Sequence, residues 1–382
     1  MQVPQPNPDS PEQLVTPPRL GRPVVLRPFS ALMLAPHRIS DPSAGRAFAR
    51  PYKDVVERLR QWQETGQVLA EPDPAVFLHE YTAGGLTVRG LVGLLDLGTR
   101  SEEPYRTGVF PHEAVHPGQV GDLAARMDET RLNPAPILLV HRGPENLRHL
   151  INVIGRRTPD RSYPDRVGTT HRLWAIRDSA ELAVIDEALA ASQLLIADGH
   201  HRYAAYLRQQ ETHPDTGWGS GLAMVVDQED TPLFLGAIHR VLRGTTLRQL
   251  ELAAAGLAVG TRRQERIAAL SDLDPDTLVA TDGSGWLTLR LPRLRDQAAV
   301  QWVHETLTPL LTRDPLHPLS GVDYHHSTDA ALASAHQGVA LLLPAPDITL
   351  LERVAARGRV LPEKATSFQP KPPVGVLMRT VD

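Results

Sequence analysis

Five residues that can bind or transfer a phosphate group follow one another at positions 198–202, in the order Asp-Gly-His-His-Arg. The apolar run 194–197 predicts a strand before them, and the residues from about 202 to 210 are typical of a helix. Backbone N–H groups at a helix N-terminus bind anions, and Gly199 would let a ligand approach the backbone closely. The spacing therefore favours a phosphate site at a junction between a strand and a helix.

The side chains in this turn have complementary chemistry. Arg202 carries a planar guanidinium that suits a phosphate group, and His200 and His201 add two titratable donors. Asp198, at the end of the strand, could hold a metal ion or orient a histidine. A single Asp-Gly pair before a helix is usually an ordinary helix cap, but five such residues in one turn favour a functional site.

A second group of chemically capable residues, Phe-Pro-His-Glu-Ala-Val-His, occupies positions 110–116. Glu113 could act as a general base on a hydroxyl group, with His112 beside it. His112 and His116 could also bind a metal, although their spacing differs from the helical His-Glu-x-x-His motif. Taken alone, this segment is typical of a solvated loop, so its function depends on what the fold places next to it.

The chain is very poor in lysine: only Lys53, Lys364 and Lys371 occur among its 40 basic residues Lys and Arg. Two of them lie in the segment 357–371, which is bounded by proline and also contains Thr and Ser. A compact ammonium group is suited to contact phosphate. Lys364 and Lys371 are therefore candidate phosphate ligands; the alternative is a surface loop followed by a C-terminal strand at 374–378.

Composition excludes several classes of protein. The chain has 382 residues and no cysteine, which excludes disulfides, thiolate catalysis and cysteine-based zinc sites. Its net charge of -4 gives no support for a nucleic-acid partner, and no apolar run approaches the length of a membrane span. Residues 1–18 are rich in Pro and Gln and lack the apolar core of a signal peptide. We therefore expect a cytoplasmic protein.

The order of the elements indicates a mixed α/β fold. Apolar patterns predict a helix at 52–65, a hairpin over 75–95 and a helix at 179–192, which Ser179 would cap. Strands and helices alternate between about 131 and 245.

Several of these segments together resemble a bacterial family known as domain of unknown function 1015. They are the sequence Ala-Asp-Gly-His-His-Arg-Tyr at 197–203, residues 108–113 and 224–240, and the run 361–371. Members of that family are linked to ATP-dependent phosphorylation of free L-serine. The Asp-Gly-His-His-Arg motif also looks like that of the ParB/sulfiredoxin-like fold, where it holds nucleotide phosphates at a helix N-terminus.

This resemblance implies a division of the chain and a role for each motif residue. The Pro- and Gln-rich composition predicts a disordered tail at 1–20, and the resemblance implies an α/β subdomain at 21–130, a ParB-like nucleotide-binding core at 131–245 and a second α/β subdomain at 246–382. Glu113 would be the catalytic base, with His112 and Asp198 as further catalytic residues, and Asp198 would also bind Mg²⁺. The residues expected to bind the phosphates of ATP or ADP are Gly199, His200, His201, Arg202, Lys364 and Lys371.

The sequence also departs from the family's pattern. After His-Glu the family tends to show a Thr, a Lys and an Asp-Arg pair, whereas this chain has Val115, Val120 and Asp122 followed by Leu123. Two expected positive charges are missing, and Ala365 replaces a Ser after the C-terminal Lys. The acceptor could therefore be a small hydroxyl compound other than serine.

Three functions remain open at this point. The first is a kinase that phosphorylates a free hydroxyl amino acid, with serine as the leading acceptor. The second is a ParB-like nucleotide-binding switch without turnover, which the missing charges favour. The third is a metal-dependent hydrolase that uses His112, His116 and Asp198.

Overall fold

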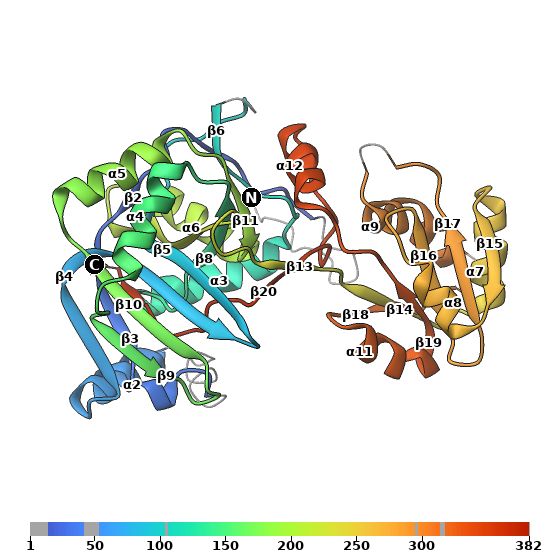
Figure 1. Cartoon of the computed structure of the whole chain (residues 1–382), viewed down its shortest axis with the longest axis horizontal. Coiled ribbons are helices and arrows are strands. Elements are labelled where there is room, and N and C mark those ends of the chain that lie inside the picture. The colour runs from blue at the N-terminus through green and yellow to red at the C-terminus, as the bar shows by residue number, and fades with distance from the viewer. Residues whose placement is uncertain (1–13, 42–52, 104–105, 295–296, 314–317, 382) are drawn as a thin grey trace, which may run out of the picture. The chain divides into compact units, whose positions relative to one another are not determined.

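The computed structural model describes residues 14–41, 53–103, 106–294, 297–313 and 318–381 (Figure 1). Its contacts cluster in two compact units. The first unit combines Met1–Leu233 with Pro370–Asp382, and the second is Phe234–Gln369. The chain therefore leaves the first unit after Leu233, builds the second unit and returns for its last residues.

Strands from the whole length of the first unit share one sheet, in the order β1-β6-β11-β8-β12-β5-β4-β10-β9. Two further described strands join it at the side, β2 on β5 and β3 on β4. The bounds are β1 Leu20–Gly21, β2 Leu26–Arg27, β3 Phe29–Leu34, β4 Val68–Ala83, β5 Leu86–Asp96, β6 Thr107–Phe110, β8 Ile137–His141, β9 Arg161–Pro164, β10 Thr170–Ile176, β11 Leu194–Asp198 and β12 Ser220–Asp227. The pairs β6–β11 and β8–β12 are parallel, and the other neighbours are antiparallel.

Helices bury the apolar faces of this sheet. Their bounds are α2 Lys53–Glu64, α3 Pro117–Thr130, α4 Glu145–Gly155, α5 Ser179–Ala190 and α6 His200–Thr212. In α6 the buried side chains include Tyr203, Tyr206 and Leu207, which join a core with Ile137 and Ile196 of the strands below. Helix α3 packs against α6. The predicted mixed α/β class is therefore confirmed.

The ends of two helices differ from the expectation. Helix α5 is capped by Asp178, whose side chain accepts hydrogen bonds from the backbone N–H groups of Ala180 and Glu181, so the prediction of Ser179 as the cap is wrong. Asp178 has an extended backbone with φ −63° and ψ 128°, as an N-cap residue requires, whereas Ser179 is already the first residue of the helix. Helix α6 begins at His200, about two residues earlier than predicted, so both histidines of the motif lie in its first turn.

The last residues of the chain are embedded in the first unit. We name residues 370–381 the C-terminal segment. Its strand β21 (Arg379–Thr380) pairs with β7 (Leu132–Asn133), and Met378 bridges to Leu32. The expected strand at 374–378 is thus wrong: Gly375 has a φ of 88°, which breaks an extended strand.

The second unit is a six-stranded sheet in the described residues, in the order β15-β17-β16-β19-β14-β18, with helices packed on it. The strands are β14 His239–Arg243, β15 Gly260–Gln264, β16 Thr277–Thr281, β17 Trp286–Arg290, β18 Gly321–His325 and β19 Gly338–Leu342. A separate pair joins β13 (Phe234–Gly236) to β20 (Ser367–Gln369). The helices are α7 Leu247–Gly256, α8 Arg266–Ser271, α9 Ala299–Trp302, α10 Thr308–Thr312, α11 Thr328–Ala333 and α12 Ile348–Ala356, with a π-helical turn between α9 and α10.

These units group the chain differently from the segments that the sequence implied. The segments 21–130 and 131–245 contribute strands to the same sheet, because β4 and β5 lie between β12 and β10. Residues 1–13 of the expected tail lie outside the described residues. The remainder of that tail is ordered: Val15 bridges to Val115, and the Tyr203 hydroxyl donates to the Pro18 carbonyl at 2.7 Å.

None of the helices in the described ranges combines the length and the apolar character that a membrane crossing requires.

Arg379 ties the C-terminal segment to the rest of the first unit, and its removal should destabilise the protein. Its guanidinium is buried and donates to the carbonyl oxygens of Ser220, at 2.6 Å, and Gly217. Arg379→Met would leave both carbonyls without this donor, so we expect a loss of about 2–4 kcal/mol in the free energy of unfolding, measured by urea titration. Arg60→Met, at an exposed helical ion pair, should change it by less than about 0.5 kcal/mol. Equal effects would contradict the anchoring role.

Candidate functional site

Two parallel neighbouring strands carry the two sequence motifs to one edge of the sheet. In β6 and β11, Val109 is opposite Leu194 and Phe110 is opposite Leu195. The chain leaves both strands in the same direction. The loop 111–116 and the turn at Asp198 therefore emerge side by side, although more than eighty residues separate them in the sequence.

Hydrogen bonds join the loop to the first turn of α6. The backbone N–H of His112 donates to Nε2 of His200 at 3.3 Å, and that of His116 donates to Nε2 of His201 at 3.1 Å. The rings of His112 and His200 meet edge to face with centroids 4.7 Å apart, and those of His116 and His201 stack at 6.1 Å. The two consecutive histidines thus hold the loop in register with the helix.

Burial keeps His200 in the neutral form. Only 6% of the residue is exposed, and burial first, followed by the nearby His112, His201 and Lys371, holds the pKa of His200 well below its usual value. A neutral imidazole can accept a hydrogen bond at Nε2, which a protonated one cannot. The contact with the His112 backbone therefore depends on His200 being uncharged.

His112 and Glu113 are adjacent but do not form a charged pair at neutral pH. His112 is fully buried, and burial lowers its pKa to about 4, against the opposing effect of a hydrogen bond with the Ile196 backbone. Its Nε2 lies 3.8 Å from Oε1 of Glu113, whose side chain is 16% exposed.

Asp198 is the centre of a cluster with two cations. Its Oδ2 accepts a hydrogen bond from Nη2 of Arg202 at 2.7 Å, and its Oδ1 contacts Nζ of Lys371. Burial disfavours the charged carboxylate, but Arg202 and Lys371 outweigh this effect, so the pKa of Asp198 lies below its usual value. The cluster is therefore ionised and carries one net positive charge.

Gly199 shapes the turn between the strand and the helix. Its φ is 91°, in the region that favours glycine, and it is the N-terminal cap residue of α6. A Cβ at this position would lie 3.0 Å from Nη2 of Arg202 and 3.1 Å from Cγ2 of Ile137. Glycine thus allows both the turn and the close approach of the Arg202 side chain.

Two features of this cluster had no signal in the sequence. The Ala135 carbonyl accepts from Nη1 of Arg202 at 3.4 Å. Tyr81 is fully buried, and its hydroxyl donates to the Pro370 carbonyl at 2.6 Å, which fixes the backbone just before Lys371. Because 289 positions separate Tyr81 from Pro370, no local pattern could reveal this contact.

Lys364 belongs to the second unit, unlike the other predicted phosphate ligands. It has a φ of 55°, and its backbone carbonyl accepts from Nη2 of Arg240 at 2.9 Å. The structure therefore places Lys364 and Lys371 in different units.

The described residues offer no classical multidentate metal centre. No group of three or more His, Cys, Asp or Glu side chains among them is arranged to hold a metal ion. The trio of His112, His116 and Asp198 expected for a hydrolase is thus not such a group, because His112 and His116 face the two histidines of α6.

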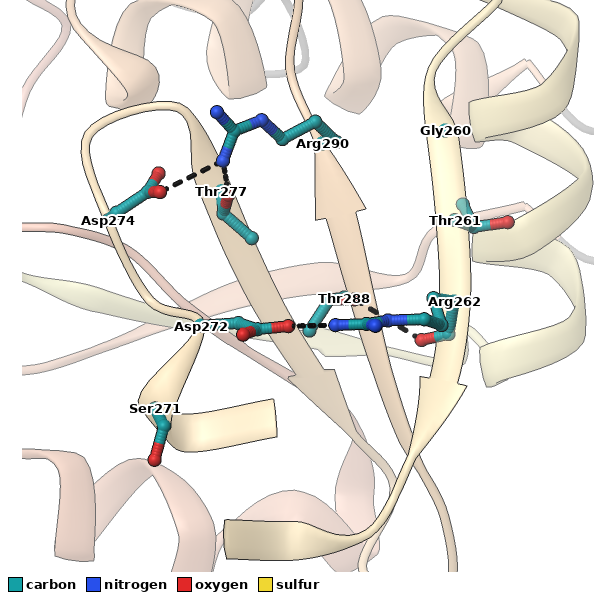
Figure 2. Close-up of a pocket in the computed structure, with 9 residues that line it drawn as sticks. All are labelled: Gly260, Thr261, Arg262, Ser271, Asp272, Asp274, Thr277, Thr288 and Arg290. Carbon is teal, nitrogen blue, oxygen red and sulfur yellow. Dashed lines mark hydrogen bonds and ion pairs between the residues drawn. The ribbon is translucent and has the colours of Figure 1, made fainter. Parts of the chain in front are cut away.

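The second unit contains a polar hollow of about 470 Å³ (Figure 2). Two ion pairs line it, Arg262–Asp272 at 2.5 Å and Arg290–Asp274 at 2.9 Å. Thr277 also accepts from Arg290, at 2.8 Å. The charged side chains of this hollow are therefore paired with one another, and none of them belongs to the motifs above.

The family model described as a protein of unknown function, DUF1015, matches residues 22–308. The chain belongs to this family. The matched region contains the loop 111–116 and the turn at Asp198, but it ends before Lys371. None of the curated proteins matches the sequence.

The solved structures to which this chain is similar share little sequence with it. Free serine kinase in complex with AMP is 14% identical, with a TM-score of 0.39, over 71% of this chain and 88% of that chain. SbnI with a C-terminal truncation, from Staphylococcus aureus, is 12% identical, with a TM-score of 0.42, over 76% and 87%. A conserved hypothetical protein from Pyrococcus furiosus is 13% identical, with a TM-score of 0.38, over 70% and 92%.

The buried His112 should make stability depend on pH. In the unfolded chain its imidazole binds a proton near pH 6.5, whereas the folded protein holds it neutral down to about pH 4. The unfolded state thus binds more protons in this window, and stability falls as the pH is lowered through it. His112→Gln should reduce this slope by about one proton, measured by urea titration at a series of pH values. The exposed His149→Gln should leave the slope unchanged, and an unchanged slope in His112→Gln would contradict the assignment.

Proposed function

We propose that this protein is a small-molecule kinase that transfers the γ-phosphate of ATP to a free hydroxyl amino acid, with L-serine as the leading acceptor. The observation that carries the proposal is the parallel pairing of β6 and β11, which brings the loop 111–116, with Glu113 in it, to the first turn of α6. A base and a phosphate-binding turn at one edge of a sheet are the parts that phosphoryl transfer requires.

The phosphate groups would bind at the start of α6. Its first N–H groups and the partial positive charge of the helix end attract anions. The Arg202 guanidinium and the Lys371 ammonium add direct charge, and the net positive charge of the Asp198 cluster favours a polyanionic ligand. His200 and His201 would keep the loop 111–116 against this turn, so that both parts of the site stay aligned.

Asp198 fits a magnesium ion that arrives with the nucleotide. Mg²⁺ in nucleotide sites is usually held by one or two carboxylates together with phosphate oxygens and water. Asp198 is ionised because Arg202 and Lys371 overcome the effect of burial on its pKa, and it stands at the end of β11. When bound, Mg²⁺ would neutralise charge on the transferred phosphate.

Glu113 would take the proton from the acceptor hydroxyl. Its carboxylate is partly buried. The His112 imidazole beside it is neutral and therefore forms no ion pair with this carboxylate. Phosphoryl transfer depends mainly on position and charge stabilisation, so holding the acceptor near this carboxylate would supply much of the catalysis.

This chain lacks a Thr and a Lys that the family tends to carry, and their absence bears on the identity of the acceptor. Val115 and Val120 belong to the hydrophobic core of the first unit, with 3% and 8% of each residue exposed. The positions where the family tends to carry a Thr and a Lys therefore serve packing in this chain. Any acceptor must be bound without these groups, which supports an acceptor pocket different from that of other members.

Phosphorus NMR tests the proposal directly. Purified protein with ATP, Mg²⁺ and a panel of free amino acids should give a new phosphomonoester signal that requires one hydroxyl amino acid. The signal should disappear in Arg202→Ala, since this variant loses a phosphate ligand. Nucleotide binding without any new signal across the panel would contradict the kinase and favour a nucleotide-dependent switch.

Glu113→Gln separates the base from the nucleotide site. This variant should bind ATP as the wild type does, but its turnover should fall by ~100-fold or more because an amide cannot accept the proton. Glu129→Gln, on the exposed side of α3, is the matched control and should keep full turnover. Unchanged turnover in Glu113→Gln would remove this residue from the role of base.

A further inference from the structure

We infer that Lys371 is an exchangeable counter-ion of Asp198: it occupies the metal-binding oxygen in the free protein and moves to a nucleotide phosphate when the nucleotide binds. The metal ion and the nucleotide would then enter the site together. This inference rests on the proposed function, and it extends it to a residue that lies beyond the matched family region 22–308.

In the free protein, cations hold both oxygens of the Asp198 carboxylate. Oδ1 contacts the Lys371 ammonium, and Oδ2 accepts from Arg202 at 2.7 Å. A divalent ion would need at least one of these oxygens, and it would repel an ammonium group that remained in contact. One of the two cations must therefore leave before Asp198 can hold a metal.

Arg202 is the less mobile of the two. It lies on α6 only four residues from Asp198, its side chain lies over Gly199, and only 24% of that side chain is exposed. The Ala135 carbonyl provides a second acceptor for its guanidinium. These contacts fix its direction, so Arg202 would remain on Oδ2 during the exchange.

The backbone at Lys371 is held in place, whereas its side chain is flexible and partly exposed. The Tyr81 hydroxyl holds the preceding Pro370 carbonyl at 2.6 Å, and Pro372 and Pro373 follow directly. The side chain itself is 43% exposed and reaches Asp198 through a flexible four-carbon stem. The ammonium can thus move by rotation of the side chain alone, without displacement of the backbone.

The charges favour this exchange only when a phosphate is present. Without one, departure of Lys371 would leave the partly buried Asp198 with Arg202 as its remaining cation. A nucleotide phosphate offers the ammonium a stronger partner and frees Oδ1 for the metal ion. Binding of one therefore promotes binding of the other, and by linkage the effect is reciprocal.

The scarcity of lysine allows a direct test. Protein labelled with ¹³C at lysine Cε should give three lysine signals, which Lys53→Arg, Lys364→Arg and Lys371→Arg assign. The Lys371 signal should shift in Asp198→Asn, because this change removes the charge of its partner. It should shift again with ADP and Mg²⁺ but stay in place with Mg²⁺ alone, and the Lys53 signal should not respond.

Affinities provide the second readout. Calorimetry should show that Mg²⁺ raises the affinity of the wild type for ADP, and that Lys371→Met weakens the binding of metal-free ADP about tenfold. The gain caused by Mg²⁺ should differ between the wild type and Lys371→Met, because the ammonium no longer competes for Asp198. Lys371→Arg should keep most of the affinity, and Arg60→Met, on α2, should match the wild type.

Different results would contradict the exchange of Lys371 and the proposed kinase function. If MgADP binds, yet the Lys371 signal does not move and Lys371→Met binds ADP like the wild type with the same effect of Mg²⁺, the exchange is overturned and the kinase proposal stands. If neither ADP nor ATP binds to the wild type, the proposed function itself fails, and the exchange fails with it.

Discussion

The parallel register of β6 against β11 is the constraint on which the site depends. Two short strands, paired at Val109–Leu194 and Phe110–Leu195, fix where the chain leaves the sheet at two distant points of the sequence. Their carboxyl ends carry the loop with Glu113 and the turn with Asp198. A change of this register would separate the two motifs even if each kept its own local structure.

Burial divides the polar residues of this edge into two groups. The histidines His112 and His200 are held neutral because the sheet and the first turn of α6 exclude water from them. The His200 ring accepts a hydrogen bond from the His112 backbone N–H and so keeps the loop in place. Charge is concentrated instead at Asp198, Arg202 and Lys371, whose side chains remain 23%, 24% and 43% exposed. Neutral groups thus provide the scaffold, and charged groups face the solvent from which an anion would arrive.

Local sequence patterns predicted the elements that carry the motifs. The strand β11, the glycine turn and the following helix could be foreseen because the apolar run, Gly199 and the helical spacing are contiguous. The hairpin β4–β5 was foreseen for the same reason. The cap of α5 was misplaced by one residue because Asp and Ser are both good caps and only the backbone geometry decides between them.

Features that depend on distant segments could not be read from local patterns. The pairing of Lys371 with Asp198 spans 173 positions, and it requires the chain to return to the first unit after building the second. The resemblance to the family indicated Lys371 as a ligand but gave no information on its partner. It also grouped Lys371 with Lys364, which the fold assigns to another unit. The replacement of a Thr and a Lys by Val115 and Val120 was visible in the sequence, whereas the role of these two residues in the core emerged only from the fold.

Histidine NMR tests most directly whether the two motifs form one nucleotide site. Protein labelled with ¹⁵N in its histidine rings would be titrated with ADP and Mg²⁺, with single His→Gln variants for assignment. The account predicts that the signals of His112, His116, His200 and His201 change together at one ligand concentration, while that of the exposed His149 stays unchanged. Changes confined to His200 and His201, or to histidines outside this set, would contradict a site built from both motifs.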